Sequence, residues 1–487
     1  MSVNDTPRHI LEEKIFSKSA FSLCDTLFFE LLFPFLLDNF SIWSIIVQYF
    51  IFPNPFHNTN GNNFSWLYFV KYDHRKKIEI LNFERKTIEF TQNLKDRMNH
   101  PNKKIAIVTD WLIDFWWAEL VISHLLEAFP EADIYTSVCY TDHPMLEGRK
   151  IYTSWIEKVP FFNRRHKLAG LLRPFAFRSF DLSSYDIIIS SSSAESKNAG
   201  FMKRKVWAKH YCYCHTPTRY YWSHAKEYED MMEFGILNPL VKMVFRMVKW
   251  WMQKVDFAAA QKVDYFIANS KNTQERIKTY YQRESTVIYP GVNIIHAPKH
   301  LEPEKQETKE NSFIHMNHGR IEPYYISIGR CIPYKRFDLL VDTFNANGKR
   351  LMLCTATDTP TFRALQLRSR SNIEWKFSVS NEVKFKLLTH AKAFLFPPEE
   401  DFGLVPVEAM AWGIPVIAYG KWGALETIQD GKTGIFFSPQ TPEALDEALE
   451  KFEKMTFDRE KIIKHAKKFS KETFQKKIID FIKDNFE

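Results

Sequence analysis

Runs of apolar residues alternate with segments of helical periodicity along most of this chain after residue 103. A short basic lead, Lys103-Lys104, enters an apolar run, and a segment with helical spacing follows near 117–129. A long helical segment occupies 238–262. Strands that alternate with helices in this way predict parallel α/β sheets. The further predicted strands are residues 132–138, 185–191, 207–215, 264–270, 324–328, 393–396 and 416–419.

The pattern divides the chain into two α/β units, as its length also suggests. The first unit is predicted at 103–297 and the second at 321–465. Residues 298–320 are polar and lack periodicity, so we interpret them as a linker. The basic segment 466–487 is helical by spacing, and residues 1–102 form an N-terminal extension.

The N-terminal extension carries an apolar run, Phe28–Phe52, whose length would span a bilayer. Glu30, Pro34 and Asp38 interrupt this run, and it lacks the basic lead and small-residue cleavage site of a signal peptide. Two interpretations remain. The run forms helices that pack on the main body, or it forms a hairpin at a membrane interface.

Composition indicates a folded protein, with 45% hydrophobic and 25% charged residues. The net charge of +8 favours acidic partners, and nucleic acid, anionic lipid and nucleoside diphosphates all meet that condition. Six cysteines include no C-x-x-C pair, which argues against zinc ribbons and thioredoxin chemistry and fits a reducing compartment. Charge alone therefore does not choose a partner.

The most specific pattern lies in residues 399–434, where Glu400 and Glu408 form an E-x7-E spacing. A predicted strand enters the turn Phe402-Gly403, and an apolar-periodic helix follows it. Unpaired backbone N–H groups and the positive dipole end at such a turn favour phosphate. The two carboxylates would then bind sugar hydroxyls. The spacing by itself fits an ordinary strand–helix turn, with its glutamates in water, equally well.

Charged residues also follow two other predicted strands. Arg330 follows the strand at 324–328, and Lys335 completes an Arg-x4-Lys pattern. Because ligands bind at the carboxyl ends of strands in open α/β sheets, these two cations suit a departing diphosphate. His215 ends the strand at 207–215. A histidine at this place either hydrogen-bonds a ligand or moves a proton, or it is a structural histidine with satisfied hydrogen bonds.

Four motifs together resemble one enzyme family. They are FG-x-VP-x-EAMA from Phe402, GR-x-x-PYKRFD from Gly329, HTP-x-RY from His215 and G-x-PVIAYGK from Gly413. Over residues 104–470 the chain is similar to the retaining nucleotide-sugar glycosyltransferases of family 4. The resemblance implies the α/β GT-B fold, in which two Rossmann-like domains face each other and a C-terminal helix crosses back onto the first.

The resemblance also implies a reaction: transfer of a hexose, with mannose expected, from a nucleoside-diphosphate donor with retention of configuration. Arg330 and Lys335 would stabilise the departing diphosphate, helped by backbone N–H groups of Gly403 to Val405. Glu408 would hold the ribose and Glu400 the sugar hydroxyls. No metal or other cofactor is implied, because the cations take that role. The implied catalytic residues are Glu400, His215, Arg330 and Lys335, and the implied donor-binding residues are Arg330, Lys335, Glu400, Phe402, Gly403, Leu404, Val405 and Glu408.

The chain departs from the family at several positions. Trp116-Trp117 precede Ala118-Glu119 in the first loop, where the family has two glycines that allow close approach of backbone to phosphate. Thr355-Ala356-Thr357 replaces a G-x-G, and Trp412 and Trp422 take positions that are usually small. These departures leave open the alternative of a catalytically impaired binding or scaffold subunit. A separate alternative is the same reaction with a glucosyl donor.

Residues 161–178 mix aromatic and basic side chains, as interfacial segments do, although the packing of a basic surface helix explains them equally well. Acceptors approach this region in the family, and lipid-linked acceptors are common there. We therefore expect a nucleotide-sugar donor, a glycan or lipid-linked acceptor and no nucleic acid partner. The expected location is cytoplasmic, with peripheral contact to the cytoplasmic face of a membrane.

Overall fold

The computed structural model describes residues 103–113, 117–159, 162, 166–223, 225–230, 238–294, 316–317, 320–321 and 323–486. All of these belong to one compact unit, residues 87–487. The interpretations of the apolar run Phe28–Phe52 fall outside the described residues.

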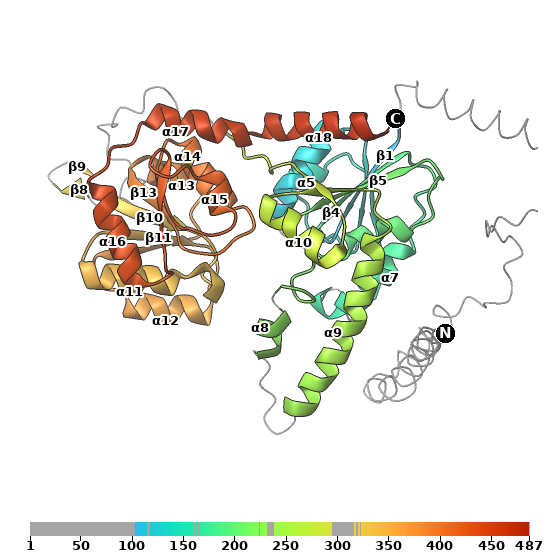
Figure 1. Cartoon of the computed structure of the whole chain (residues 1–487), viewed down its shortest axis with the longest axis horizontal. Helices are drawn as coiled ribbons and strands as arrows, with labels where there is room; N and C mark the ends of the chain where they lie inside the picture. Colours follow the sequence, from blue (N-terminus) through green and yellow to red (C-terminus); the bar gives the residue numbers. More distant parts are fainter. Residues whose placement is uncertain are drawn as a thin grey trace, which may run out of the picture. The chain divides into compact units, whose positions relative to one another are not determined.

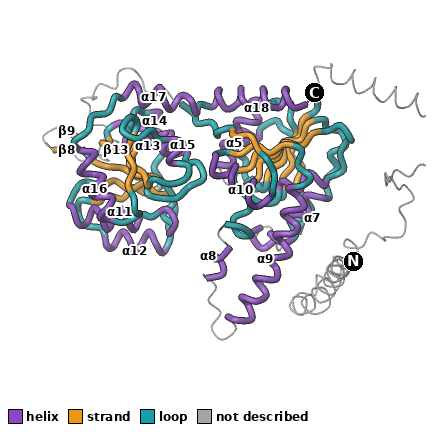
Figure 2. Tube along the Cα trace, in the orientation of Figure 1, coloured by secondary structure: helices purple, strands orange, loops and turns teal. Residues whose placement is uncertain are grey.

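In the described part of residues 103–297, parallel strands form a seven-stranded sheet of order β3-β2-β1-β4-β5-β6-β7. Figure 1 labels β1, β4 and β5 of this sheet, and Figure 2 draws its strands in orange. Strand β1 pairs with β2 on one side and β4 on the other, so Ile107 lies opposite both Ile134 and Ile189. The strands are β1 (Ile105–Thr109), β2 (Asp133–Thr136), β3 (Ile151–Thr153), β4 (Ile187–Ser192), β5 (Lys209–Cys214), β6 (Tyr265–Ala268) and β7 (Ser285–Val287).

Helices cover both faces of this sheet, because successive side chains of a strand point to opposite faces. Ile107 packs in one apolar cluster with α5 (Trp117–Ala128) and α18 (Lys471–Phe486), while Ala106 and Val108 face the other side. Tyr211 on β5 donates to the Ile482 carbonyl of α18 at 3.3 Å. The other face is covered by α7 (Arg173–Arg178), the 3-10 helix η4 (Ser196–Phe201), α9 (Asn238–Ala260) and α10 (Lys271–Tyr281). A further short helix, α8, spans Ala225–Asp230.

The second α/β unit contains a six-stranded parallel sheet of order β12-β11-β10-β13-β14-β15 in its described residues. Figure 1 labels β10, β11 and β13 of this sheet. Its strands are β10 (Tyr324–Ile328), β11 (Leu351–Thr355), β12 (Ile373–Phe377), β13 (Ala391–Phe396), β14 (Val416–Tyr419) and β15 (Gly434–Phe437). The predicted strands at 324–328, 393–396 and 416–419 are therefore confirmed.

Two helical layers also enclose the second sheet (Figure 1). One cluster contains α11 (Phe337–Asn347), α12 (Pro360–Arg368) and α16 (Pro442–Glu453). The other contains α13 (Asn381–Thr389), α14 (Leu404–Ala411) and α17 (Arg459–Ala466), with the short α15 (Ala424–Thr427). Side-chain oxygens at the N-cap begin several of these helices, which is the role those residue types favour. The capping residues are Thr359, Ser380, Thr441 and Asp458.

Two local predictions differ from the structure. Residues 316–317 (β8) and 320–321 (β9), at the end of the predicted linker 298–320 and the start of the second unit, pair as antiparallel strands. The helix predicted over 466–487 begins later, at Lys471. Just before it, the chain hydrogen-bonds to Val292 in the manner of paired strands: Val292 accepts from the Lys471 N–H and donates to the Phe469 carbonyl. Ser470 then accepts from the Thr473 N–H at 3.2 Å and starts α18.

Both sheets reverse their strand order beside the first strand of the unit, between β1 and β4 and between β10 and β13. Loops that leave the carboxyl ends of such a strand pair separate to opposite faces, and the resulting crevice is where open α/β sheets bind ligands. The fold therefore places Asp110 and Ser193 at one crevice, and Arg330 and the turn after Phe396 at the other.

Candidate functional site

Hydroxyl groups hold the loop that follows β10. The Cys331 N–H lies 3.2 Å from Thr355 Oγ1 and 3.1 Å from Thr357 Oγ1. A short 3-10 helix, η7 (Pro333–Lys335), ends this loop. Arg330 is exposed, and its guanidinium donates to the Tyr334 hydroxyl at 3.3 Å. The two threonines that replace the expected G-x-G thus fix the loop that carries both cations.

The structure brings Lys335 and Glu400 together. The Lys335 ammonium and one Glu400 carboxylate oxygen form an ion pair, with side chains 10% and 18% exposed. Lys335 follows β10 and Glu400 follows β13, so the neighbouring carboxyl ends of these strands create the pair. A cation and a carboxylate side by side at this edge can neutralise phosphate and bind hydroxyl groups at once.

The turn after Glu400 presents backbone rather than side chains. Gly403 has a φ of +83°, a region that favours glycine, and an added Cβ would meet the Phe396 ring at 3.0 Å. No side chain caps α14, which starts at Leu404. Phe402, Leu404 and Val405 are buried, so their side chains pack in the core and do not face a ligand. Of these predicted donor-binding residues, only the backbone is placed to meet an anion.

Glu408 lies one turn into α14 and contacts the Lys384 ammonium at 3.3 Å. Burial raises the pKa of its carboxyl, and Lys384 opposes that rise. Glu400 and Glu408 therefore have separate cationic partners, Lys335 and Lys384. The two glutamates of the E-x7-E spacing thus differ in the lysine that each one contacts.

His215 follows β5 at the crevice of the first sheet. Its Nε2 lies 2.8 Å from Ser191 Oγ at the end of β4, and its backbone carbonyl accepts from Thr273 Oγ1 at 3.2 Å. Burial lowers the pKa of the imidazole from 6.5 to about 4, against the opposing effect of Asp110. The ring is therefore neutral near pH 7, and one ring nitrogen is fixed by Ser191.

This pKa predicts acid sensitivity of the first domain. Between pH 6.5 and about 4 the unfolded chain binds a proton at His215 that the folded chain does not. Stability is therefore full above pH 6.5, falls as the pH drops through this window and levels off below it. In urea unfolding at pH 7, 5.5 and 4.5, His215→Gln should lose less stability on acidification than the parent. The exposed His390→Gln is the matched control, and a parent-like slope in His215→Gln would contradict the assignment.

Asp110, directly after β1, organises the loop opposite His215. Its carboxylate accepts backbone N–H groups of Ser193 at 2.6 Å, Ala194 at 2.9 Å and Ser196 at 2.7 Å. Three such bonds to one buried carboxylate fix the loop between β4 and η4. Sequence reasoning missed this residue, although its place after a predicted strand carried the same signal as that of Arg330.

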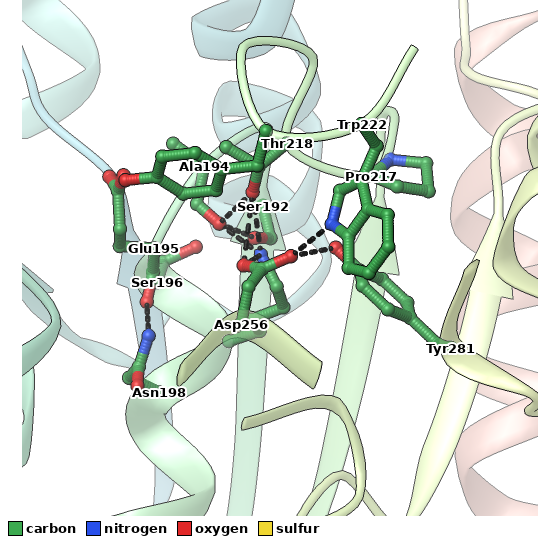
Figure 3. Close-up of polar contacts among 12 residues, drawn as sticks. Ser192, Ala194, Glu195, Ser196, Asn198, Pro217, Thr218, Trp222, Asp256 and Tyr281 are labelled. Atoms are coloured by element: carbon green, nitrogen blue, oxygen red, sulfur yellow. Dashed lines mark hydrogen bonds and ion pairs between the residues drawn. The ribbon is translucent and has the colours of Figure 1, made fainter. Parts of the chain in front are cut away.

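A buried ion pair anchors the segment that follows His215 (Figure 3). Lys197 Nζ lies 2.7 Å from Asp256 Oδ1, and both side chains are 1% exposed. The Asp256 carboxylate also accepts from Thr218 Oγ1 at 3.1 Å, Trp222 Nε1 at 2.8 Å and the Tyr281 hydroxyl at 2.7 Å. The Asp256 carboxylate of α9 thus contacts side chains of η4, α10 and the HTP-x-RY segment.

The same segment contacts the second sheet's turn through Asp401. Arg219 Nη2 lies 2.7 Å from Asp401 Oδ2, and Asn272 Nδ2 lies 3.0 Å from Oδ1. Arg276 forms a second ion pair with Oδ1. Asp401 is 5% exposed, and sequence reasoning gave it no role despite its place beside Glu400.

Comparison with known proteins agrees with this arrangement. The family model of "Glycosyltransferase Family 4" matches residues 118–295, and that of "Glycosyl transferases group 1" matches residues 309–469. The two matches cover the second sheet, every strand of the first sheet except β1, and the segments that carry His215, Lys335 and Glu400. The chain belongs to glycosyltransferase family 4.

Among curated family members, an alpha-1,3/1,6-mannosyltransferase of Schizosaccharomyces pombe is 25% identical over 343 residues, 62% of this chain and 64% of the relative. The corresponding Mus musculus protein is 26% identical over 271 residues, 50% of this chain and 64% of that relative. The chain thus spans less than two thirds of the length of these two relatives.

Solved structures support the GT-B fold of the family. HepE of Anabaena in complex with UDP-glucose matches with a TM-score of 0.56 and 15% identity, covering 78% of this chain and 99% of that chain. Sucrose-phosphate synthase of Thermosynechococcus elongatus matches with a TM-score of 0.55 and 16% identity, covering 79% and 99%. The predicted α/β fold of two Rossmann-like sheets is confirmed.

The family's first loop is only partly described here. Trp116 lies outside the described residues, and Trp117 begins α5. Ala118 is half-buried and Glu119 is buried. The effect of Trp116-Trp117 on activity stays a prediction. By contrast, Trp412 ends α14 and stacks on Phe385 at 4.9 Å, where it fills core space.

Neither a membrane-spanning helix nor a cluster of metal-ligating side chains is found in the described part of this family 4 chain. No described helix is long and apolar enough to cross a membrane. No group of three or more His, Cys, Asp or Glu side chains gathers there in a way that could hold a metal ion. The proposed metal independence stays a prediction.

Proposed function

We propose that the protein transfers mannose from a nucleoside-diphosphate mannose to an acceptor hydroxyl with retention of configuration. The bond between the sugar C1 and the diphosphate oxygen breaks, and a C1–oxygen bond to the acceptor forms on the same face. The acceptor hydroxyl loses its proton, and the nucleoside diphosphate leaves with the electron pair of the broken bond.

The Lys335–Glu400 ion pair beside the α14 N-terminus carries this proposal. The Lys335 side chain is 10% exposed and lies at the carboxyl edge of β10 and β13. Lys335, the exposed Arg330 and the N-terminal N–H groups of α14 supply positive charge for the diphosphate as its negative charge develops. Glu400 would bind sugar hydroxyls while Lys335 turns to phosphate.

Position and charge support the remaining proposed roles. Glu408, steadied by Lys384, would accept the ribose hydroxyls. His215, neutral near pH 7, would hydrogen-bond the transferred sugar. The cations take the place of a divalent metal, so transfer should persist in the presence of a chelator.

A donor screen tests the proposal. The full chain is titrated with GDP-mannose, UDP-glucose and an ADP-sugar by calorimetry, and any donor that binds is assayed for release of its nucleoside diphosphate and for transfer. Binding and turnover of GDP-mannose are expected. Turnover of UDP-glucose alone would identify glucose, instead of mannose, as the transferred sugar. Binding of a donor without turnover would favour the non-catalytic alternative. Failure of all three donors to bind would overturn the donor site.

For the acceptor, we propose a glycan on a lipid carrier at the cytoplasmic face of a membrane. Apolar side chains are exposed on α9, with Leu240 at 53%, Met243 at 51% and Trp250 at 45%, and on α7, with Phe175 at 42%. Lys242, Lys249 and Lys254 add positive charge along α9. Apolar and cationic side chains together favour anionic lipid surfaces.

Flotation with liposomes checks the membrane contact. The protein should float with vesicles that contain phosphatidylserine and stay in solution with purely zwitterionic vesicles. Replacing Leu240, Met243 and Trp250 together by serine should reduce the floated fraction, whereas the exposed Leu367→Ser should not. Protein that stays wholly in the soluble fraction with anionic vesicles would count against the contact.

A further inference from the structure

The carboxylate of Asp401 is satisfied entirely by groups of the first α/β unit, although it belongs to the second. Arg219 occupies one oxygen at 2.7 Å, while Arg276 and Asn272 share the other. Asp401 is 5% exposed, so little of the carboxylate is left for a substrate. Its chain neighbour Glu400 pairs instead with Lys335 of its own unit. Adjacent carboxylates thus have different partners.

A second carboxylate of the same unit makes a parallel contact. Glu426, on α15, accepts from the Lys271 N–H at 2.8 Å and from the Asn272 N–H at 3.2 Å. These are the first N–H groups of α10, where a negative charge is stabilised by the helix dipole. The Arg276 guanidinium also lies 4.6 Å from the centre of the Trp422 ring. Helix α10 therefore meets both the Asp401 turn and the α15 segment.

Helix α10 also holds the segment of His215. Thr273 donates to the His215 carbonyl at 3.2 Å, and Arg276 donates to Thr216 Oγ1 at 3.3 Å. Arg219 lies in that segment, four residues after His215. The His215 segment is thus linked to Asp401 in two ways, through α10 and directly through Arg219.

The donor turn is itself fixed to the α15 segment. The Gly423 N–H donates to the Glu400 carbonyl at 3.0 Å, and an added Cβ on Gly423 would lie 2.4 Å from the Phe402 Cα. A shift of Asp401 relative to Arg219 would therefore move Glu400 relative to His215. Such displacements are costly in transfer reactions, because the reacting groups must be held in a narrow geometry.

We propose that Asp401 is a positioning residue. It holds Arg219 and Arg276 and thereby sets the His215 segment against the donor turn, so that transfer needs this carboxylate although substrate does not contact it. This inference rests on the proposed function for its kinetic consequences. Nucleotide binding, by contrast, is assigned to Arg330, Lys335 and Glu408 of the second unit alone.

The variants Asp401→Asn and Asp401→Glu test the inference in the full chain, with Asp358→Asn as control. Asp358 also pairs with an arginine, Arg363, but both side chains are exposed. Asp401→Asn should lower kcat with GDP-mannose about tenfold or more while the Kd for GDP changes less than about twofold. Asp401→Glu should recover most of kcat because it keeps the charge. Asp358→Asn should match the parent in both values.

Two kinetic outcomes would overturn the inference: an unchanged kcat in Asp401→Asn, or a loss of GDP affinity as large as the loss of kcat. If circular dichroism shows that Asp401→Asn loses folded structure, Arg219→Gln is measured instead. That variant must then show the lower kcat with little change in the Kd for GDP.

A structural readout separates this inference from the proposed function. Spin labels on Lys203→Cys and Glu443→Cys, exposed residues of the two units, report their separation by double electron–electron resonance. Asp401→Asn should broaden or shift the distance distribution, while Asp358→Asn should leave it as in the parent. If the parent turns over no nucleotide sugar, the proposed function is wrong, and the distance measurement alone tests whether Asp401 positions the two units. An unchanged distance distribution in Asp401→Asn would then overturn the positioning role.

Discussion

Replacing Lys335 by alanine should weaken nucleotide-sugar binding and transfer about 10- to 150-fold, equivalent to about 1.5–3 kcal/mol for a lost charge-assisted contact. The change removes the partly buried ammonium that pairs with Glu400. It also leaves the Glu400 carboxylate, whose side chain is 18% exposed, without this partner at the place where a diphosphate would sit. The departing diphosphate then meets an unneutralised carboxylate as well as a missing cation.

Calorimetry with GDP and steady-state kinetics with GDP-mannose measure this effect. Lys392→Ala is the matched control, because Lys392 belongs to the same unit and makes a more exposed pair with Glu453. The control should bind and turn over donor as the parent does. If Lys335→Ala keeps the parent's affinity and rate, the assignment of the donor phosphate site to this loop is wrong.

Replacing Lys197 by methionine should destabilise the first domain by about 3–5 kcal/mol, because it leaves the fully buried Asp256 carboxylate without its cation. The remaining hydrogen bonds from Thr218, Trp222 and Tyr281 compensate that charge only in part. A change of this size is a large fraction of the stability of a typical domain.

Urea unfolding of the full chain, followed by circular dichroism, measures the loss. The exposed pair Lys203–Asp181 supplies the control, and Lys203→Met should change the free energy of unfolding by less than about 0.5 kcal/mol. In the double variant Lys197→Met/Asp256→Asn the buried charge is gone while an amide oxygen still accepts hydrogen bonds. It should therefore be more stable than Lys197→Met alone. Equal stability of Lys197→Met and Lys203→Met would show that the buried pair contributes little.

The local pattern predicted the α/β order of the chain and the strands that carry the site. Continuous apolar runs indicate strands covered on both faces, and the positions of Arg330, Lys335, Glu400 and His215 after such runs placed them at strand ends. Short edge strands such as β3 and β7 were missed, because three-residue strands carry too little periodicity to be recognised.

Roles that depend on contacts distant in the sequence were not predictable from spacing. Lys335 and Glu400 are 65 residues apart, and Arg219 and Asp401 are 182 apart. Each pair is created by the strand order of the sheets or by contact between the two units. Asp401 and Glu400 are neighbours in the chain, yet one positions the first unit and the other faces the proposed donor.

The sequence by itself determined the family, the two α/β units and the charged residues at the carboxyl ends of their strands, because these depend on local periodicity and on contiguous motifs. Only the tertiary structure decided which charges pair, which predicted donor residues bury their side chains, and where the C-terminal helix begins. Those outcomes depend on which strands become neighbours and on how far each side chain is removed from water, and both are properties of the folded chain as a whole.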